Sequence, residues 1–175
     1  MSAPRIRRAG AGDAAALAAF AERTFVNTYG AYNTAADMAA YVAGAFGAAL
    51  QARELADPGL VTLVVVDGGG ALAGYAQLRC PGPAPACVAG AAPAELCRFY
   101  VDAPWQGRGL APRLMDAVRE AAAALGAASL WLAVWERNAR ARSFYAKCGF
   151  HEAGAAEFLL GTDRQVDRVL SRSVA

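Results

Sequence analysis

Lysine and histidine are almost missing from this sequence, and its positively charged residues are scattered along the chain. Lys147 is the only lysine and His151 the only histidine, while 17 Lys and Arg residues stand against 15 Asp and Glu residues for a net charge of +2. The arginines occur singly or in pairs, so no basic stripe runs along the chain. This balance argues against a nucleic-acid partner.

Long uninterrupted hydrophobic runs are also absent. Charged residues break the alanine-rich stretches well before the roughly 20 apolar residues that a membrane-spanning helix needs. No unbroken apolar region follows the arginines of the N-terminal segment, so no signal peptide is indicated. We therefore expect no membrane partner and a cytoplasmic location.

Paired cysteine motifs are missing as well. Cys80, Cys87, Cys97 and Cys148 show neither CxxC spacing nor the spacing of zinc ligands. We expect four unpaired cysteines, as small core residues or surface thiols, and no metal site.

The chain shows no internal repeat and no linker between domains. Its 175 residues, of which 57% are hydrophobic, suffice for one sizeable core, so we expect residues 1–175 to form a single domain. Periodicity predicts strands over 5–9, 60–66, 71–80, 95–102, 129–135, 151–160 and 165–171, and helical regions from Asp13, from Thr34 to Leu55, from Gly109 to Gly126 and over 139–147. This order predicts an α/β fold in which about four helices flank a mixed sheet of about seven strands.

The most informative segment is the glycine-containing loop Gln106–Ala111, which follows a predicted strand and opens a predicted helix. Glycines let the backbone approach a ligand closely, and the free N–H groups of the first helical turn favour an anion such as a diphosphate. The glycine spacing differs from a Rossmann fingerprint, and no Gly-Lys-Ser/Thr follows as in a Walker A loop. Such a loop alone is also compatible with a plain turn.

The residues before and after this loop indicate more specifically what it binds. The strand residues Glu95–Val101 precede it, and Asn138, Tyr145 and Gly149-Phe150 follow it in order. This arrangement resembles the GNAT superfamily of N-acetyltransferases, whose Q/R-x-x-G-x-G/A loop is followed by a strand and by a helix with an Asn…Tyr…Gly-Phe pattern. The resemblance implies a mostly antiparallel sheet splayed between its fourth and fifth strands, with acetyl-CoA as co-substrate in the gap.

The resemblance also implies how acetyl-CoA is bound. Phe99, Tyr100 and Val101 would bond the pantetheine arm through their backbone, and Asn138 would contact the same arm. The pyrophosphate would be held by the backbone N–H groups of Gly107, Arg108, Gly109, Leu110 and Ala111, helped by the side chains of Gln106 and Arg108. The segment Gln106–Ala111 is called the anion loop below. Many family members have glycine where this chain has Ala111, a common variant.

Chemical roles follow for two residues. The resemblance places Tyr145 near the thioester sulfur, where a phenol with a pKa near 10 can protonate the leaving thiolate. The amine must lose a proton before it attacks, and Glu95 is the first candidate for the base, with Glu136 second. Tyr145 as a core residue and Glu95 as a solvated edge residue are the alternatives. No cysteine has a histidine partner at a recognisable spacing, so we expect direct transfer in a ternary complex.

Patches in the N-terminal half and near the C-terminus resemble the PaiA-type branch, whose members acetylate spermidine and spermine. This resemblance implies a small polycationic amine as acceptor, bound by Tyr29, Asp37, Tyr41 and Asp167, and it implies a homodimer at the family level. The slightly basic composition fits a polyamine poorly, because such a site should concentrate carboxylates. A protein N-terminus, a peptide lysine, an amino acid or an aminoglycoside therefore stay open as acceptors, as does a non-catalytic acyl-CoA-binding module. Trp131 and Trp135 alternate on one strand face, which core packing explains.

Overall fold

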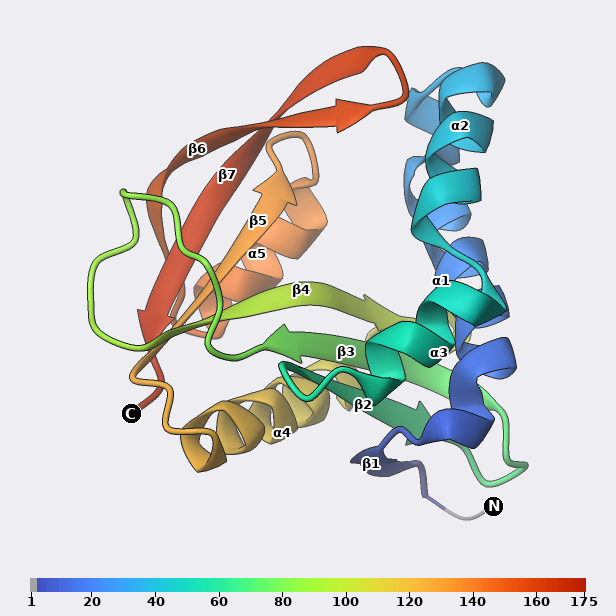
Figure 1. Cartoon of the computed structure of the whole chain (residues 1–175), viewed down its shortest axis with the longest axis horizontal. Helices are drawn as coiled ribbons and strands as arrows, with labels where there is room; N and C mark the ends of the chain where they lie inside the picture. Colours follow the sequence, from blue (N-terminus) through green and yellow to red (C-terminus); the bar gives the residue numbers. More distant parts are fainter. Residues whose placement is uncertain (1–2) are drawn as a thin grey trace.

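The computed structural model describes residues 3–175 and shows one seven-stranded sheet with helices on both faces (Figure 1). The strand order is β1-β2-β3-β4-β5-β7-β6, and every neighbouring pair is antiparallel except β4–β5. The strands are β1 (Arg5–Arg8), β2 (Leu60–Val66), β3 (Leu72–Arg79), β4 (Pro93–Val101), β5 (Ser129–Trp135), β6 (His151–Leu160) and β7 (Asp163–Ser173). The helices are α1 (Ala14–Tyr29), α2 (Ala35–Ala45), α3 (Ala48–Ala56), α4 (Leu110–Ala124) and α5 (Ala139–Lys147). This arrangement is the α/β fold expected from the sequence.

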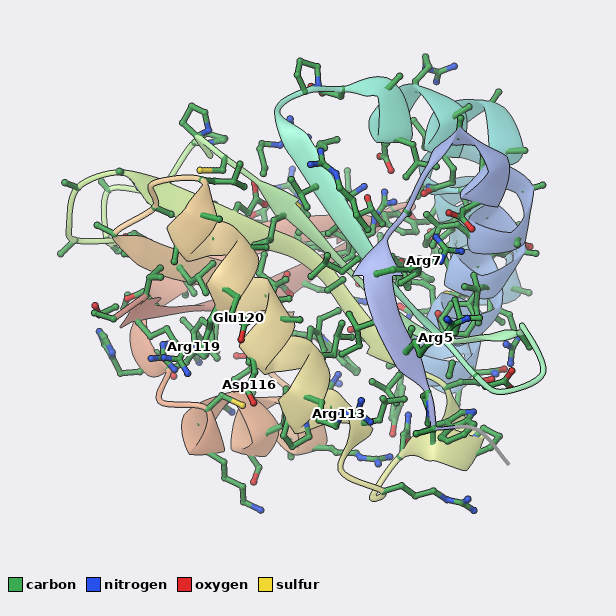
Figure 2. The ribbon with its side chains drawn as sticks, turned by 90° about the horizontal axis from the view of Figure 1, so that it is seen from below. Arg5, Arg7, Arg113, Asp116, Arg119 and Glu120 are labelled. Atoms are coloured by element: carbon green, nitrogen blue, oxygen red, sulfur yellow. The ribbon has the colours of Figure 1, made fainter. Side chains whose placement is uncertain are left out.

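One core lies between the sheet and α4. Leu114 and Val118 recur at helical spacing on the inner face of α4 and are fully buried against strand residues such as Leu78 and Leu130. Figure 2 shows α4 crossing the sheet beside β1, with charged residues along its length. The guanidinium of Arg113 donates to the carbonyl oxygen of Pro4 at 3.2 Å and so ties α4 to the start of the chain.

A second, aromatic core lies on the other face, under α1, α2 and α3. Phe20 of α1 meets Tyr75 of β3 edge to face, with ring centroids 5.9 Å apart. Phe25 stacks on Tyr41 of α2 at 4.8 Å. These contacts hold the end of α1 and the whole of α2 over the middle of the sheet, where the site lies.

The sheet opens between β4 and β5, as predicted. The two strands pair only over Pro93–Glu95 and Ser129–Trp131, although both continue further. On its other edge β4 carries a bulge, because Gln77 pairs with Arg98 and Leu78 with Leu96, which leaves Cys97 without an opposite residue. A bulge bends its strand and increases the local twist, which helps to separate the two strands.

One helical prediction was wrong in detail. The region from Thr34 to Leu55 is two helices, because the chain turns at Phe46 and Gly47 between α2 and α3. Gly47 adopts φ 147°, a conformation that side-chain-bearing residues rarely adopt. The Phe46 side chain is drawn into the aromatic core at this point, so tertiary packing overrides the helical spacing.

Candidate active site

A cleft of about 1060 Å³ runs through the opening between β4 and β5. Its walls come from the far half of β4, the end of β5, the loop before α4, the inner side of α5 and the last turns of α1. Nine of the predicted cofactor-binding positions line it, namely Phe99, Tyr100, Val101, Gln106, Gly107, Gly109, Ala111, Asn138 and Tyr145. Arg108 and Leu110 do not line it, since Arg108 is exposed and Leu110 is buried in the core under α4.

The anion loop has the backbone that a phosphate site needs. Gly107 and Gly109 adopt φ values of 76° and 77°, and Gly109 is the N-cap of α4 with no side chain capping the first helical turn. A Cβ at either glycine would have no neighbour within 4 Å, so the left-handed backbone rather than crowding requires glycine. The Gln106 amide donates to the carbonyl oxygen of Val101 at 2.8 Å and fixes the loop to β4. The free N–H groups of the first turn of α4 lie beside the cleft, since Gly109 and Ala111 line it, and such groups favour an anion.

The edge of β4 beyond Glu95 faces the cleft without a strand partner. Residues 97–101 line the cleft there, so their backbone groups on this edge are free for an extended ligand with amide groups. The unpaired residue of the bulge, Cys97, lies in the same stretch.

Tyr145 lies in the wall of the cleft on α5, buried among aromatic rings. The ring centroids of Phe99, Phe144 and Phe150 lie 6.2, 5.4 and 5.7 Å from its own. Burial raises the pKa of the Tyr145 phenol well above its usual value, with a smaller contribution from Tyr29 nearby. At neutral pH this phenol is protonated and has a proton to give.

Asn138 connects the two sides of the cleft. Its side-chain oxygen accepts a hydrogen bond from the Ala141 N–H at 3.1 Å and so caps α5, the helix that carries Tyr145. The phenol of Tyr29 at the end of α1 lies beside the Asn138 side chain and beside the hydroxyl of Tyr100. Burial nevertheless raises the pKa of Tyr29, because desolvation is the largest effect there.

The two base candidates lie outside the residues that line the cleft. Glu95 is half-buried opposite Trp131, at the last position where β4 and β5 still pair, and burial raises its pKa against the opposing charge of Arg79. Glu136 is held in an ion pair with Arg168 at 3.0 Å. Glu95 is therefore the freer of the two carboxylates.

The four predicted acceptor residues are not all brought together. Tyr29 lines the cleft, whereas Tyr41 and Asp167 lie behind it, close enough for the Asp167 charge to raise the pKa of both phenols. Asp37 is at another place, because its carboxylate accepts hydrogen bonds from the Thr34 hydroxyl at 2.7 Å and from the Thr162 N–H at 2.6 Å. These bonds hold the pKa of Asp37 below its usual value and join α2 to the β6–β7 turn.

Several cleft residues were not predicted, among them Tyr32, Trp135 and Arg98. Tyr32 and Trp135 form one wall with ring centroids 5.2 Å apart, and Trp135 had been explained by core packing alone. Arg98 lines the cleft and pairs with Glu54 of α3 at 3.0 Å. Sequence spacing gives no signal for these residues, because they come from elements that meet only in the fold.

Two absences hold within residues 3–175. No group of three or more His, Cys, Asp or Glu side chains is placed to hold a metal ion. No helix in this part of the chain combines the length and hydrophobicity needed to cross a bilayer. All four cysteines are free thiols.

Known proteins share both the sequence and the fold. The chain is 32% identical over 157 residues to an uncharacterized N-acetyltransferase of Lactobacillus delbrueckii subsp. lactis, covering 89% of each chain. It is 34% identical over 163 residues to one of Mycobacterium bovis, covering 93% of this chain and 98% of the relative. Among solved structures, the PaiA N-acetyltransferase of Thermoplasma acidophilum in complex with coenzyme A has the same fold, with a TM-score of 0.79 at 19% identity over 99% of both chains.

A family model agrees with these relatives. The model described as the acetyltransferase (GNAT) family matches residues 25–150, which include the anion loop, the free edge of β4 and Tyr145. The chain belongs to the GNAT family of N-acetyltransferases, which use coenzyme A.

Proposed function

We propose that this N-acetyltransferase moves the acetyl group of acetyl-CoA directly onto the primary amine of a small molecule, with both substrates bound at once. The observation that carries the proposal is the single cleft through the split sheet. The anion loop and the free β4 edge lie along this cleft, and the end of α1 with Tyr29 and Tyr32 lies along it too. Tyr145 lies in the wall between them, where a thioester and an amine would meet.

The binding of acetyl-CoA follows from the charges and free backbone groups of the cleft. The pyrophosphate would accept hydrogen bonds from the N–H groups that follow Gly107 and Gly109, with the α4 dipole behind them. The pantetheine amides would pair with residues 99–101 of β4, and Asn138 would contact the same arm from the opposite side. Arg108 is exposed beside this loop and adds a positive charge near the phosphates.

The transfer needs a series of proton and charge movements. The amine, after losing a proton to Glu95 directly or through water, attacks the thioester carbonyl carbon with its lone pair. The carbonyl oxygen becomes an oxyanion that a β4 backbone N–H near Cys97 stabilises. The oxyanion then collapses, the C–S bond breaks and the thiolate takes the proton of Tyr145. The attacking nitrogen loses its second proton, which restores the Tyr145 phenol through water.

A small acceptor is favoured by a contact between α2 and the β6–β7 turn. The bonds from Thr162 to Asp37 join α2 to the β6–β7 turn, which lie side by side at one end of the molecule (Figure 1). We infer that this connection hinders a long peptide chain more than a small amine. A polyamine is one candidate among small amines, since a spermidine N-acetyltransferase chimera shares the fold at a TM-score of 0.68 and 19% identity. A cytoplasmic location and a homodimer stay predictions from the sequence and the family.

The test is release of free thiol from acetyl-CoA against spermidine, spermine, simple alkylamines, lysine and N-terminal alanine peptides, an aminoglycoside and amino acids. We expect turnover with small primary amines and little with the peptides. Tight binding of acetyl-CoA in calorimetry without turnover of any amine would instead support the non-catalytic binding module. Preferred turnover of the peptides would reject the small acceptor but leave the acetyl transfer in place.

A further inference from the structure

The carboxylates of the elements around the cleft are almost all occupied, and Asp102, which lines the cleft, is paired with Arg23 at 2.9 Å. Asp37 is bound by Thr34 and Thr162, and Glu54 is bound by Arg98 and Gln77. Within residues 3–175, the acidic side chains with neither an ion pair nor a hydrogen bond of 3.5 Å or less in the structure are Glu22, Glu95, Glu120 and Asp167. Glu120 lies on the far side of the sheet, on α4 (Figure 2), and Glu22 is exposed on α1.

Asp167 is the free carboxylate with a link to the acceptor end of the cleft: it does not itself line the cleft, but its charge acts on Tyr29, which does. It is the cross-strand partner of Trp135, so the two side chains lie on the same face of the sheet. It is half-buried, and burial alone raises its pKa to about 6. A partly desolvated carboxylate without a partner costs free energy, which a bound cation would recover.

Aromatic rings form the wall beside this carboxylate. Trp135 lies 6.0 Å from Tyr29 and 5.2 Å from Tyr32, centroid to centroid, in edge-to-face arrangements. Tyr32 is 67% exposed, which is unusual for a large aromatic side chain. Ala133 on the same strand face is also exposed in the cleft. Such a wall attracts flat apolar groups and, through the faces of its rings, one cation.

The positive groups of the cleft disfavour further cationic charge. Arg98 lines it from β4, and Arg137 and Arg140 line it from the start of α5. Only Arg98 among them is paired with a carboxylate, Glu54. A polyamine would bring two or more additional ammonium groups, and no free carboxylate except Glu95 is left to meet them.

Given the acetyl transfer proposed above, we infer that the acceptor is a monocationic primary amine on an apolar or aromatic body, with Asp167 pairing its ammonium group and Tyr32 and Trp135 contacting its body. The ammonium gives up one proton through water before its nitrogen attacks the thioester. The substrate class is therefore that of arylalkyl- or alkylamines rather than polyamines.

Matched amines test the charge requirement. Hexylamine and pentane-1,5-diamine have the same length and differ only in a terminal methyl or ammonium group. We expect kcat/KM for hexylamine to exceed that for the diamine by about tenfold or more, and spermidine to be the poorest of the three. A diamine or spermidine that is turned over faster than hexylamine overturns the inference and leaves the proposed acetyl transfer intact. No turnover with any amine overturns both.

Variants test the two contacts. Asp167→Asn should raise KM for hexylamine about tenfold with a smaller change in kcat, whereas Glu120→Gln, which removes an unpaired carboxylate from the far face, should change neither. Tyr32→Ala should lower kcat/KM about fivefold for 2-phenylethylamine but leave ethylamine, which lacks the ring, unchanged. Both substituted positions are partly or largely exposed, so the variants should fold, and circular dichroism checks this. Unchanged kinetics in a folded Asp167→Asn variant would contradict the proposed ion pair.

Discussion

Tyr145 shows how burial can prepare a single residue for catalysis. Its phenol is enclosed by Phe99, Phe144 and Phe150, and the absence of water around it disfavours the phenolate. A phenol with a raised pKa is a weaker acid than a free phenol, but it is protonated at neutral pH and can give its proton to a strongly basic thiolate that is formed beside it. The same burial that would fit a plain core residue therefore also fits a general acid facing the cleft.

Removing this hydroxyl should affect turnover and little else. We expect Tyr145→Phe to lower kcat by about a hundredfold or more, the usual contribution of a general acid, with the dissociation constant of acetyl-CoA nearly unchanged in calorimetry. Tyr75→Phe is the matched control, because the Tyr75 hydroxyl is also buried but lies in the aromatic core without a hydrogen-bond partner. A Tyr145→Phe variant with the kcat of the parent would show that Tyr145 only packs.

Asp167 should make the stability of the protein depend on pH. Its folded-state pKa of about 6 lies above the value near 3.9 of an unfolded chain, so the folded state binds more protons between these values. Stability therefore falls as pH rises from about 4 to 6, and the full cost is present at pH 7. Asp167→Asn removes this cost.

We expect the Tm of Asp167→Asn to exceed that of the parent at pH 8 and to approach it at pH 4. Because Asp167 is partly exposed, solvent screening limits the gain to about 1 kcal/mol, or about 2–4 °C in Tm for a chain of this size. Thermal melts across this pH range measure the difference, with Glu120→Gln as the exposed control. A difference in Tm that does not change with pH would mean that Asp167 is not charged at pH 8 in the folded protein.

At the scale of elements, helix α4 is flanked at both ends by glycines that have the same left-handed backbone conformation but different functions. Gly109 precedes the helix at φ 77° and Gly126 follows it at φ 79°, and a Cβ at either position would have no neighbour within 4 Å. An alanine at either position therefore meets the same backbone penalty, about 1 kcal/mol, and no clash. Only Gly109 lies in the cleft.

Because the two glycines match in conformation, variants at the two positions distinguish an effect on stability from an effect on ligand binding. We expect Gly109→Ala and Gly126→Ala to lower the free energy of unfolding by similar amounts in urea melts. Gly109→Ala should also raise KM for acetyl-CoA about tenfold, because it disturbs the N–H groups that face the pyrophosphate, and Gly126→Ala should leave this KM unchanged. Equal KM values in the two variants would argue against the anion loop as the phosphate site.

At the scale of the whole molecule, the cleft separates strands that share only a short ladder. β4 and β5 pair over three residues each, so a ligand bound along the rest of the opening adds contacts that join the two parts of the sheet. A ligand that binds only the folded state at a hundred times its dissociation constant stabilises it by about 2.7 kcal/mol. For a chain of this length that corresponds to a rise in Tm of about 5–10 °C.

We therefore expect acetyl-CoA at that concentration to raise Tm by this amount in thermal melts of the whole chain. The shift for Gly109→Ala at the same acetyl-CoA concentration should be smaller, and that for Gly126→Ala should equal the parent's. An unchanged Tm in the presence of acetyl-CoA would show that the nucleotide does not bind the folded protein, and would contradict the cleft as its site.

Local signals explain which features could be predicted from the sequence. The glycines of the anion loop, Tyr145 and the strand over 129–135 depend on neighbours within a few residues, and the structure shows these elements at the predicted places. The positions of Asp37 and Asp167 depend on contacts between distant segments. Asp37 is held by Thr162, more than a hundred residues away, so no spacing rule could place it outside the cleft.

The sequence alone determined the family, the order of helices and strands, the backbone of the anion loop and the buried phenol, because periodicity and glycine positions act over short stretches of chain. Only the tertiary structure decided where helix α2 ends, which carboxylates are already paired, and that Tyr32 and Trp135 form a wall beside Asp167. Charge pairing and cleft walls are made by residues that meet across the fold. The choice of acceptor amine, which depends on both, is therefore a property of packing rather than of any motif.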